Sequence, residues 1–178
     1  LCQTNYRKFF EMLATYSYQI RPFERFCICL NEGFLDASCF IGDEALRYGY
    51  TEDMHLVISC GPSLEDGKDT VNLYRKFKTD RLLPYLDEER DHPVVYIFAP
   101  MFFEDRCFGY VALNPGKDLS TYTETFRVWM KNVNMGMEAF YRQKALTTLI
   151  DQIKSNQVRD IQTGLYNYQG FLEKLNLM

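Results

Sequence analysis

The sequence lacks an apolar run long enough to cross a lipid bilayer. Its longest run, 93–103, covers about half of the residues that a spanning helix needs, and it contains two prolines. No positively charged segment followed by an apolar one opens the chain, so no export signal is predicted. The chain starts with Leu1 rather than Met, which predicts a piece of a longer protein. We expect a cytoplasmic protein without a membrane segment.

The sequence also lacks a block of basic residues. Its 20 lysines and arginines are outnumbered by 24 acidic residues, for a net charge of −4. Nucleic-acid binders usually carry a basic face, so no nucleic-acid partner is predicted. The length of 178 residues, 47% of them hydrophobic, is enough for one globular domain with an appendage.

Residues that ligate metals or act as nucleophiles are few. There are only two histidines, and Cys27 and Cys29 are one residue apart, whereas zinc and redox motifs usually place two residues between their cysteines. Most cysteines lie in apolar stretches, where a thiol behaves as a small apolar side chain. No phosphate-binding glycine loop or nucleophile motif occurs. We therefore predict no metal site, no cofactor and no catalytic residue in this chain.

Hydrophobic periodicity divides the first two thirds of the chain into short elements. Apolar residues at three- and four-residue steps predict a helix over 6–20, which Pro22 ends. Apolar runs bounded by turn residues predict strands at 25–30, 36–41, 54–60, 93–103 and 107–113. The first two of these strands are expected to form a hairpin. Within the weaker pattern of 63–91, the apolar residues at 71–77 predict one or two helical turns.

A long helix is predicted from Thr121 to Gln157. Thr121 and Glu124 form a capping box, and no proline follows before Gln157, so the helix would be about 54 Å long. Its apolar residues step by four and three, as in a coiled coil, and the frame slips by one residue near Phe140. The two frames are Phe126, Met130, Val133, Met137 and Phe140, then Ala139, Gln143, Leu146, Ile150 and Ile153.

Two interpretations of this stripe remain open, packing on the protein's own sheet and packing on a twin helix. We expect the first half to pack on the sheet and the half beyond Arg142 to pair in a parallel homodimer. The residues expected to form the dimer helix are Phe140, Leu146, Ile150 and Ile153.

The residues that follow the long helix carry a recognisable motif. The segment 159–172 reads RDIQTGLYNYQGFL and resembles the opening of GGDEF domains, the diguanylate cyclases, whose pattern is D-x-L-T-G-L-x-N-R-R-x-F. The matching positions are Asp160, Thr163, Gly164, Leu165, Asn167 and Phe171. Gln162, Tyr168 and Gln169 depart from the pattern, which leaves the activity of a downstream cyclase open.

The resemblance implies that the parent protein makes cyclic di-GMP from GTP with Mg²⁺. In that family the metal-binding and guanine-binding residues follow the opening motif, and the GGDEF signature lies further on. None of these is present here, so this chain is not expected to be a cyclase itself. The motif is expected to act as a rigid turn, in which Thr and Asn side chains bind nearby backbone and Gly164 permits a positive φ.

The layout before this motif is similar to a GAF domain, although PAS and GAF domains are not firmly separated by layout alone. The resemblance implies an α+β fold of the PAS/GAF superfold, an antiparallel β-sheet flanked by an N-terminal helix and a long C-terminal helix. The expected domains are 1–120 for the sensory part, 121–157 for the signalling helix and 158–178 for the cyclase opening. Tyr96, Phe98 and Phe108 are candidates to line a ligand cavity for a small molecule of unspecified chemistry.

Three functions follow from these observations. The first is a sensory and dimerisation domain that controls a diguanylate cyclase through the long helix. The second is a GAF-type reductase that would use paired thiols, either Cys60 with Cys107 or Cys29 with Cys39. Burial of these thiols in apolar surroundings would raise their pKa and argue against it. The third is a dimerisation spacer that binds no ligand.

Overall fold

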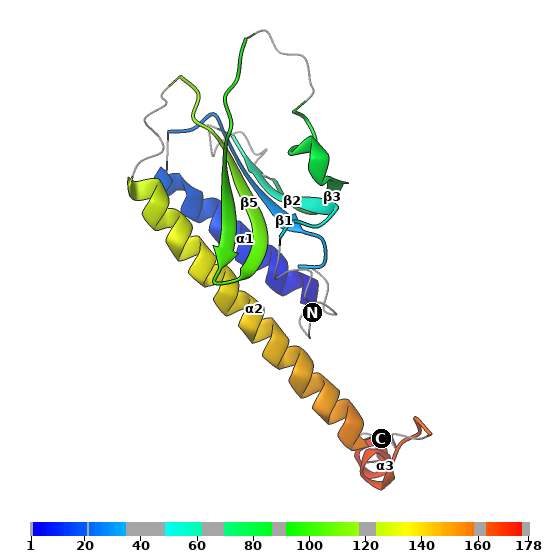
Figure 1. Ribbon diagram of the computed structural model, residues 1–178. Helices are drawn as coiled ribbons and strands as arrows, with labels where there is room; N and C mark the ends of the chain where they lie inside the picture. Colours follow the sequence, from blue (N-terminus) through cyan, green and yellow to red (C-terminus); the bar gives the residue numbers. More distant parts are fainter. Residues whose placement is uncertain are drawn as a thin grey trace.

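The fold is α+β, with two long helices on one face of an antiparallel sheet (Figure 1). The computed structural model describes residues 2–20, 22–34, 49–61, 70–86, 92–117, 124–158 and 163–175. Its helices are α1 (Cys2–Tyr16), α2 (Glu124–Val158) and α3 (Tyr168–Leu175), with short 3-10 helices η1 (Ser17–Ile20) and η4 (Thr79–Arg81). Its strands are β1 (Arg25–Asn31), β2 (Asp53–Cys60), β3 (Thr70–Lys78), β4 (Ile97–Phe103) and β5 (Arg106–Asn114).

The sheet has the strand order β3-β2-β1-β5-β4, and every neighbouring pair is antiparallel. The central strand β1 is a run of apolar residues that is buried on both faces after its first residue, Arg25. Since alternate residues of a strand point to opposite faces, β1 contributes to two separate cores. Phe26, Ile28 and Leu30 belong to one core, and Cys27 and Cys29 belong to the other.

The first core lies between the sheet and the helices, and we call this side of the sheet the helix face. Apolar residues of α1 and of the first half of α2 pack there against β1, β2 and β5. Trp129, the only tryptophan, is 1% exposed and makes an edge contact with Phe26 at 5.3 Å between ring centroids. Its indole N–H donates to the Tyr16 carbonyl at 3.2 Å, which joins α2 to the end of α1.

The second core lies on the opposite side of the sheet, which we call the loop face. The segment 79–86, which follows β3, places Leu83 and Tyr85 over the thiols of β1. The other members of this core are Met54, Leu56, Phe77, Tyr110 and Ala112. Both faces of the sheet are therefore covered, one by helices and the other by irregular chain.

Two sequence predictions about strands were wrong. The stretch expected to contain helical turns is strand β3, because the apolar residues Val71, Leu73 and Phe77 also fit a period of two and the ladder with β2 stabilises the extended form. The hairpin between 25–30 and 36–41 does not form as expected, since β1 pairs with β2 along one edge and with β5 along the other. Residues 36–41 themselves lie outside the described residues.

The remaining predicted elements are present with small changes in their ends. The strand expected over 93–103 begins at Ile97, and the helix expected over 6–20 ends in the 3-10 turn η1. The long helix begins at Glu124 in the described part of the chain, and Thr121 of the predicted capping box lies outside it. Among the described residues, no helix combines the length and apolar character that crossing a bilayer requires.

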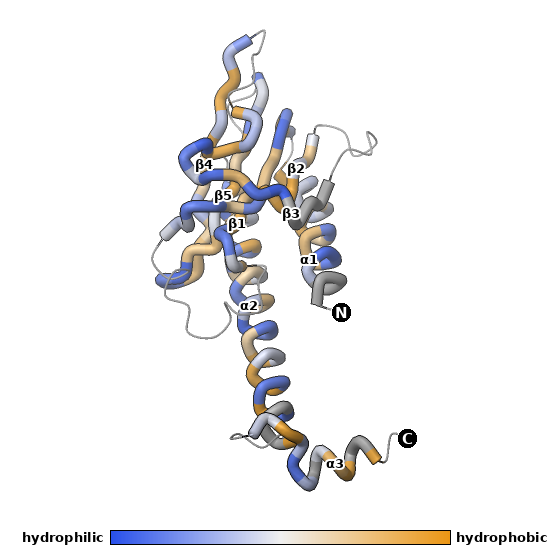
Figure 2. Tube along the Cα trace, turned by 90° about the vertical axis from the view of Figure 1, so that its right-hand side faces the viewer, coloured by the Kyte–Doolittle hydropathy of each residue, from blue (hydrophilic) through white to orange (hydrophobic). Residues whose placement is uncertain are grey.

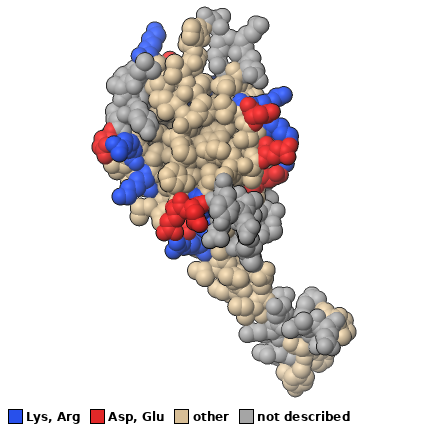
Figure 3. All heavy atoms as spheres, in the orientation of Figure 1, with Lys and Arg blue, Asp and Glu red and all other residues tan. Residues whose placement is uncertain are grey.

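The second half of α2 extends away from the sheet and ends near α3, as Figures 1 and 2 both show. Buried residues along α2 stop at Lys144, and the large apolar residues from Leu146 to Ile153 are exposed. Figure 3 shows charged side chains at the margins of the sheet-bearing part and uncharged residues over its middle. The described chain therefore has a domain with two cores and a helix, α2, that extends beyond this domain.

Candidate functional site

The loop face carries thiols and phenols in direct contact. Tyr85 reaches down from the segment after β3, and its hydroxyl oxygen lies 2.6 Å from the Cys27 sulfur, a distance at which either group can donate. The Cys27 thiol also donates to the Ser59 hydroxyl at 3.8 Å, on the neighbouring strand. Tyr85 is 5% exposed and Cys27 is fully buried, so this contact is shielded from solvent.

A row of aromatic rings crosses the same face beside this contact. The Tyr110 ring lies between Tyr50, at 5.6 Å, and Phe98, at 5.7 Å, and both contacts are edge-on. Tyr96 follows at 6.3 Å from Phe98. The Tyr110 hydroxyl donates to the Leu82 carbonyl, which holds the segment after β3 against the sheet. Edge-on aromatic contacts of this kind add stability beyond the burial of apolar area.

The predicted cavity residues do not share one face. Tyr96 and Phe98 lie on the loop face, whereas Phe108 is fully buried on the helix face, 5.7 Å from Phe34. Tyr110, two positions further along β5, lies on the loop face and makes the ring contact with Phe98. The pairing of β5 with β4 brings Tyr110 close to Phe98, since Tyr110 is opposite Pro100, which is two residues after Phe98 in β4. That pairing cannot be read from one strand alone.

The thiols of the loop face are not activated. Burial raises the pKa of the Cys27 thiol despite its contact with Tyr85, and burial raises that of Cys29 further. Burial also raises the pKa of Tyr85, with a further contribution from Cys27. Thiols and phenols in this environment stay protonated at neutral pH, so they lack the low-pKa thiolate that redox catalysis requires.

The cysteine pairs of the reductase hypothesis are not brought together in the described chain. Cys60 is opposite Phe26, and Phe26 is opposite Leu113, whereas Cys107 lies six residues earlier in β5. At 3.3 Å per residue, this offset places the two cysteines at opposite ends of the sheet, about 20 Å apart. The other pair includes Cys39, which lies outside the described residues.

A buried carboxylate marks the point where α2 leaves the sheet. Glu138 is 6% exposed, and both of its oxygens accept from Arg106, at 3.0 and 3.2 Å. One of them also accepts from Arg142 at 2.6 Å, one turn further along α2. The Arg106 guanidinium lies 3.9 Å from the centre of the Tyr141 ring. The start of β5 and one turn of α2 are thus joined by charge and by cation–π contact.

The same turn of α2 is also joined to α1. Phe140 stacks on Phe9 at 4.3 Å, with the rings 12° from parallel, and makes an edge contact with Tyr6. The Lys144 ammonium lies 4.9 Å from the Tyr6 ring, although Lys144 is only 8% exposed. Phe140, expected in the dimer helix, therefore packs within the chain's own helix face.

The other three predicted dimer residues are exposed. Leu146 is 61%, Ile150 49% and Ile153 57% exposed, and Leu149 beside them is 41% exposed. They lie on α2 beyond the last contact with the sheet-bearing part, on one side of the helix by their spacing of three and four. This stripe has no apolar neighbour in the described chain that covers it.

The described part of the opening motif, 163–172, forms a turn that leads into α3 and caps it. The Asn167 side-chain oxygen accepts from the Gly170 N–H at 2.9 Å, so Asn167 is the N-cap of α3, and its own N–H donates to the Val158 carbonyl at 3.0 Å. Gly164 has a φ of +69°, which glycine adopts without strain. Leu165 and Phe171 are exposed, Thr163 is exposed too, and Asp160 lies outside the described residues.

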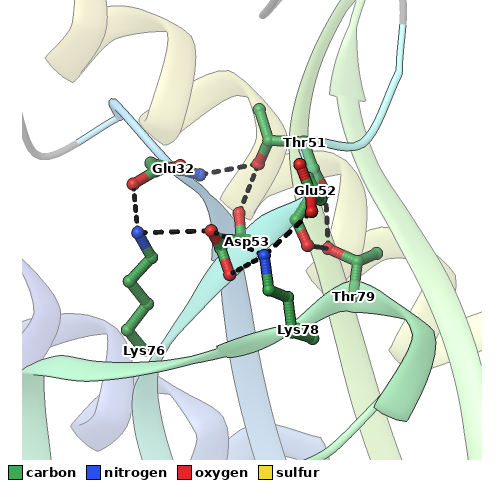
Figure 4. A network of polar contacts seen from close by, with 7 residues as sticks. All are labelled: Glu32, Thr51, Glu52, Asp53, Lys76, Lys78 and Thr79. Carbon is green, nitrogen blue, oxygen red and sulfur yellow. Dashed lines mark hydrogen bonds and ion pairs between the residues drawn. The ribbon is translucent and has the colours of Figure 1, made fainter.

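A surface network of charges joins three strands at one end of the sheet (Figure 4). Lys76 donates to Glu32 at 2.5 Å and pairs with Asp53 at 3.3 Å, and Lys78 donates to Glu52 at 2.9 Å and also pairs with Asp53. Each lysine thus has two carboxylate partners. Both lysines are paired within the network, so its ion pairs join the strand ends.

Two grooves of about 570 Å³ each flank the long helix. One runs between β4 and α2, and the other runs between α1 and α2 beside Gly136.

In the described part of the chain, no group of three or more His, Cys, Asp or Glu side chains is placed to hold a metal ion. Comparison with protein-family models, with curated proteins and with solved structures finds no significant match.

Proposed function

We propose that this chain is a cytoplasmic, GAF-like sensory and dimerisation domain that controls a diguanylate cyclase through α2. The observation that carries the proposal is the continuity of α2. One helix of 35 residues runs from the core of the helix face to the turn that resembles the opening of a cyclase domain. A change in the domain that moves the helix therefore moves whatever follows the turn.

The exposed stripe supports pairing of two copies through α2. Leu146, Ile150 and Ile153 step by four and three, which is the spacing of a coiled-coil seam. A helix with this much exposed apolar surface gains stability when a second helix covers it. A parallel pair is the arrangement that brings two copies of the opening motif side by side, and a twofold dimer is the commonest assembly of identical chains.

Pairing of this kind fits the chemistry of the proposed output. Cyclic di-GMP is built from two GTP molecules, so two cyclase half-sites must meet face to face. A ligand that binds one arrangement of the paired helices better than the other shifts their equilibrium by its differential affinity. The helical turn with Glu138 and Phe140 joins α2 to β5 and α1 close to the point where the helix leaves the domain.

The turn after α2 supports the same proposal. The Asn167 cap and the bond from Asn167 to Val158 fix the direction in which the chain leaves the helix. A Cβ on Gly170 would lie 2.2 Å from the Val158 carbonyl oxygen, so this turn is tightly packed. The exposed Phe171, Leu172 and Leu175 of α3 are the kind of apolar surface that a larger domain would cover.

The experiment that tests this function measures cyclic di-GMP formation by the full-length gene product. One residue inserted after Gln143 turns the helix beyond it by about 100°, and we expect a change in cyclase rate of tenfold or more. Seven residues inserted at the same place restore the facing of the stripe to within about 20° and serve as the control. The proposal would be contradicted if the full-length protein had no cyclase activity, or if neither insertion changed the cyclase rate.

The spacer that binds no ligand is the main competing function. Its supporting observation is that Tyr85, Leu83 and Met54 fill the centre of the loop face with protein side chains. A spacer and a sensor share the dimer helix, so they differ only in whether a ligand binds.

A further inference from the structure

Two arginines from different strands contact the ring of one tyrosine on the loop face. The Arg25 guanidinium carbon lies 4.9 Å from the centre of the Tyr85 ring, and that of Arg75 lies 5.8 Å from it. Arg25 begins β1 and Arg75 is in β3, with β2 between these strands. The Tyr85 ring lies within reach of both, so the fold of the segment after β3 brings the two arginines to one ring.

Neither arginine is neutralised in the part of the chain that the structure describes. No described carboxylate lies within ion-pair distance of Arg25 or Arg75, whereas Arg7, Arg106, Arg127 and Arg142 each have one. Lys76, next to Arg75 in β3, has two. Bringing two like charges to one ring costs free energy that the cation–π contacts offset only in part.

The groups under the arginines are hydrogen-bonding and uncharged. The Tyr85 hydroxyl touches the Cys27 thiol, and that thiol touches the Ser59 hydroxyl. Arg25 is two residues before Cys27 in β1, and Arg75 is opposite Leu56, which shares a core with Cys27, so both arginines lie on the loop face. An anion held by the two guanidinium groups would meet two cations beside the Tyr85 ring, with uncharged groups buried behind that ring.

We propose that Arg25 and Arg75 bind the anionic group of a small ligand, a phosphate or a carboxylate, beside Tyr85. Guanidinium groups bind both anions through paired N–H bonds, and stacking on an aromatic ring orients them for it. The rings of Tyr96 and Phe98, on the same face, would contact the rest of such a ligand. The inference rests on the proposed function, because the anion would be the signal that the sensory domain detects.

The test is a titration of the full 178-residue chain followed by NMR. Inorganic phosphate and succinate are added separately at constant ionic strength, with sodium chloride as the reference anion. We expect saturable shifts of the Arg25 and Arg75 side-chain Nε–H signals with one of the two anions, which identifies the anionic group. Arg25→Gln and Arg75→Gln should each weaken that binding about tenfold or more.

Arg81→Gln is the matched control, because Arg81 is exposed, lies in η4 near the same face and makes no described ion pair. It should bind the anion as the wild type does. Arg75→Lys keeps the charge without the paired N–H groups and is used if a glutamine variant does not fold, with weakened binding again expected. The proposal is overturned by the absence of saturable binding, or by equal loss in Arg81→Gln. This result is independent of dimerisation and of cyclase activity.

Discussion

Replacing Glu138 by glutamine should destabilise the protein more than any exposed charge substitution of the same kind. The side chain of Glu138 is 8% exposed, and its carboxylate accepts from Arg106 and Arg142. Glutamine keeps the shape and one acceptor oxygen, but it removes the charge that two guanidinium groups face. Arg106, which is itself 26% exposed, then keeps a partly buried charge without its carboxylate.

The expected loss follows from the burial of each partner. Breaking a buried ion pair by removing one member costs roughly 3–5 kcal/mol, and an exposed pair contributes about 0–1 kcal/mol. The ion pair of Glu138 with Arg106 is close to a buried pair. The ion pair with Arg142 is close to an exposed pair, because Arg142 is 64% exposed. Because glutamine still accepts one hydrogen bond, we expect a loss of about 2–3 kcal/mol in the free energy of unfolding.

Urea unfolding followed by the fluorescence of Trp129 measures this loss. Trp129 is the only tryptophan and is buried in the helix-face core, so it reports on the region that Glu138 holds. Protein concentration is kept constant, since association also stabilises the folded state. Glu124→Gln is the matched control, because its ion pair with Arg127 is exposed on both sides and should change stability by less than about 0.5 kcal/mol. Equal effects of the two substitutions would refute the reasoning.

Three further predictions concern single contacts. Partial burial of Asp53 opposes its ionisation, but hydrogen bonds from Lys78 and Lys76 hold its pKa below the ordinary value. The stability that this charge adds is present above the pKa of an unfolded aspartate and is lost as the pH falls through the lower folded pKa. The urea midpoint of Asp53→Asn should therefore lie below that of the wild type at neutral pH, and the difference between the two midpoints should shrink in acid. A Cβ on Gly109, whose φ is +146°, would lie 2.0 Å from the Cys29 carbonyl oxygen. Gly109→Ala should therefore lower the free energy of unfolding, measured in urea, by at least about 3 kcal/mol. Gly170→Ala should speed amide exchange at Asn167, whose N–H bonds to Val158, without changing the Trp129 transition.

The sequence allowed the order of most elements to be predicted, because their signals are local. Strands near 54–60 and 107–113 have apolar runs with turn residues at their ends, and α2 has helix formers without proline. Strand β3 was missed because its apolar residues fit both helical and extended periods. The choice between them is made by pairing with β2, which is a contact between distant parts of the chain.

The candidate site was harder to predict than the fold, and Phe108 shows why. Successive residues of a strand point to opposite faces, so an aromatic residue in β5 is assigned to one core or the other by its register with β1 and β4. Phe108 and Tyr110 share the spacing of a strand, but the chain places the first on the helix face and the second on the loop face. The pair of Arg25 and Arg75 depends on Tyr85 from a third segment, which no spacing in the sequence indicates.

The central strand offers a route between the proposed ligand site and the helix. Arg25 and Cys27 of β1 face the loop side, and Phe26 between them packs on Trp129 of α2. A shift of β1 by a bound anion would therefore change the packing under α2 directly. This coupling is a hypothesis, and it predicts that saturating anion moves the fluorescence of Trp129 in the wild type and not in Arg25→Gln.

Cross-linking of α2 tests the central claim most directly. In a parallel pair, position 153 of one copy faces position 153 of the other, at a separation that a disulfide can span, whereas Asp151 points away from the seam. Under mild oxidation we predict that Ile153→Cys gives a covalent dimer and that Asp151→Cys and the wild type do not. If Ile153→Cys stays monomeric, or if both variants cross-link to the same extent, then α2 does not pair through this stripe and the account is contradicted.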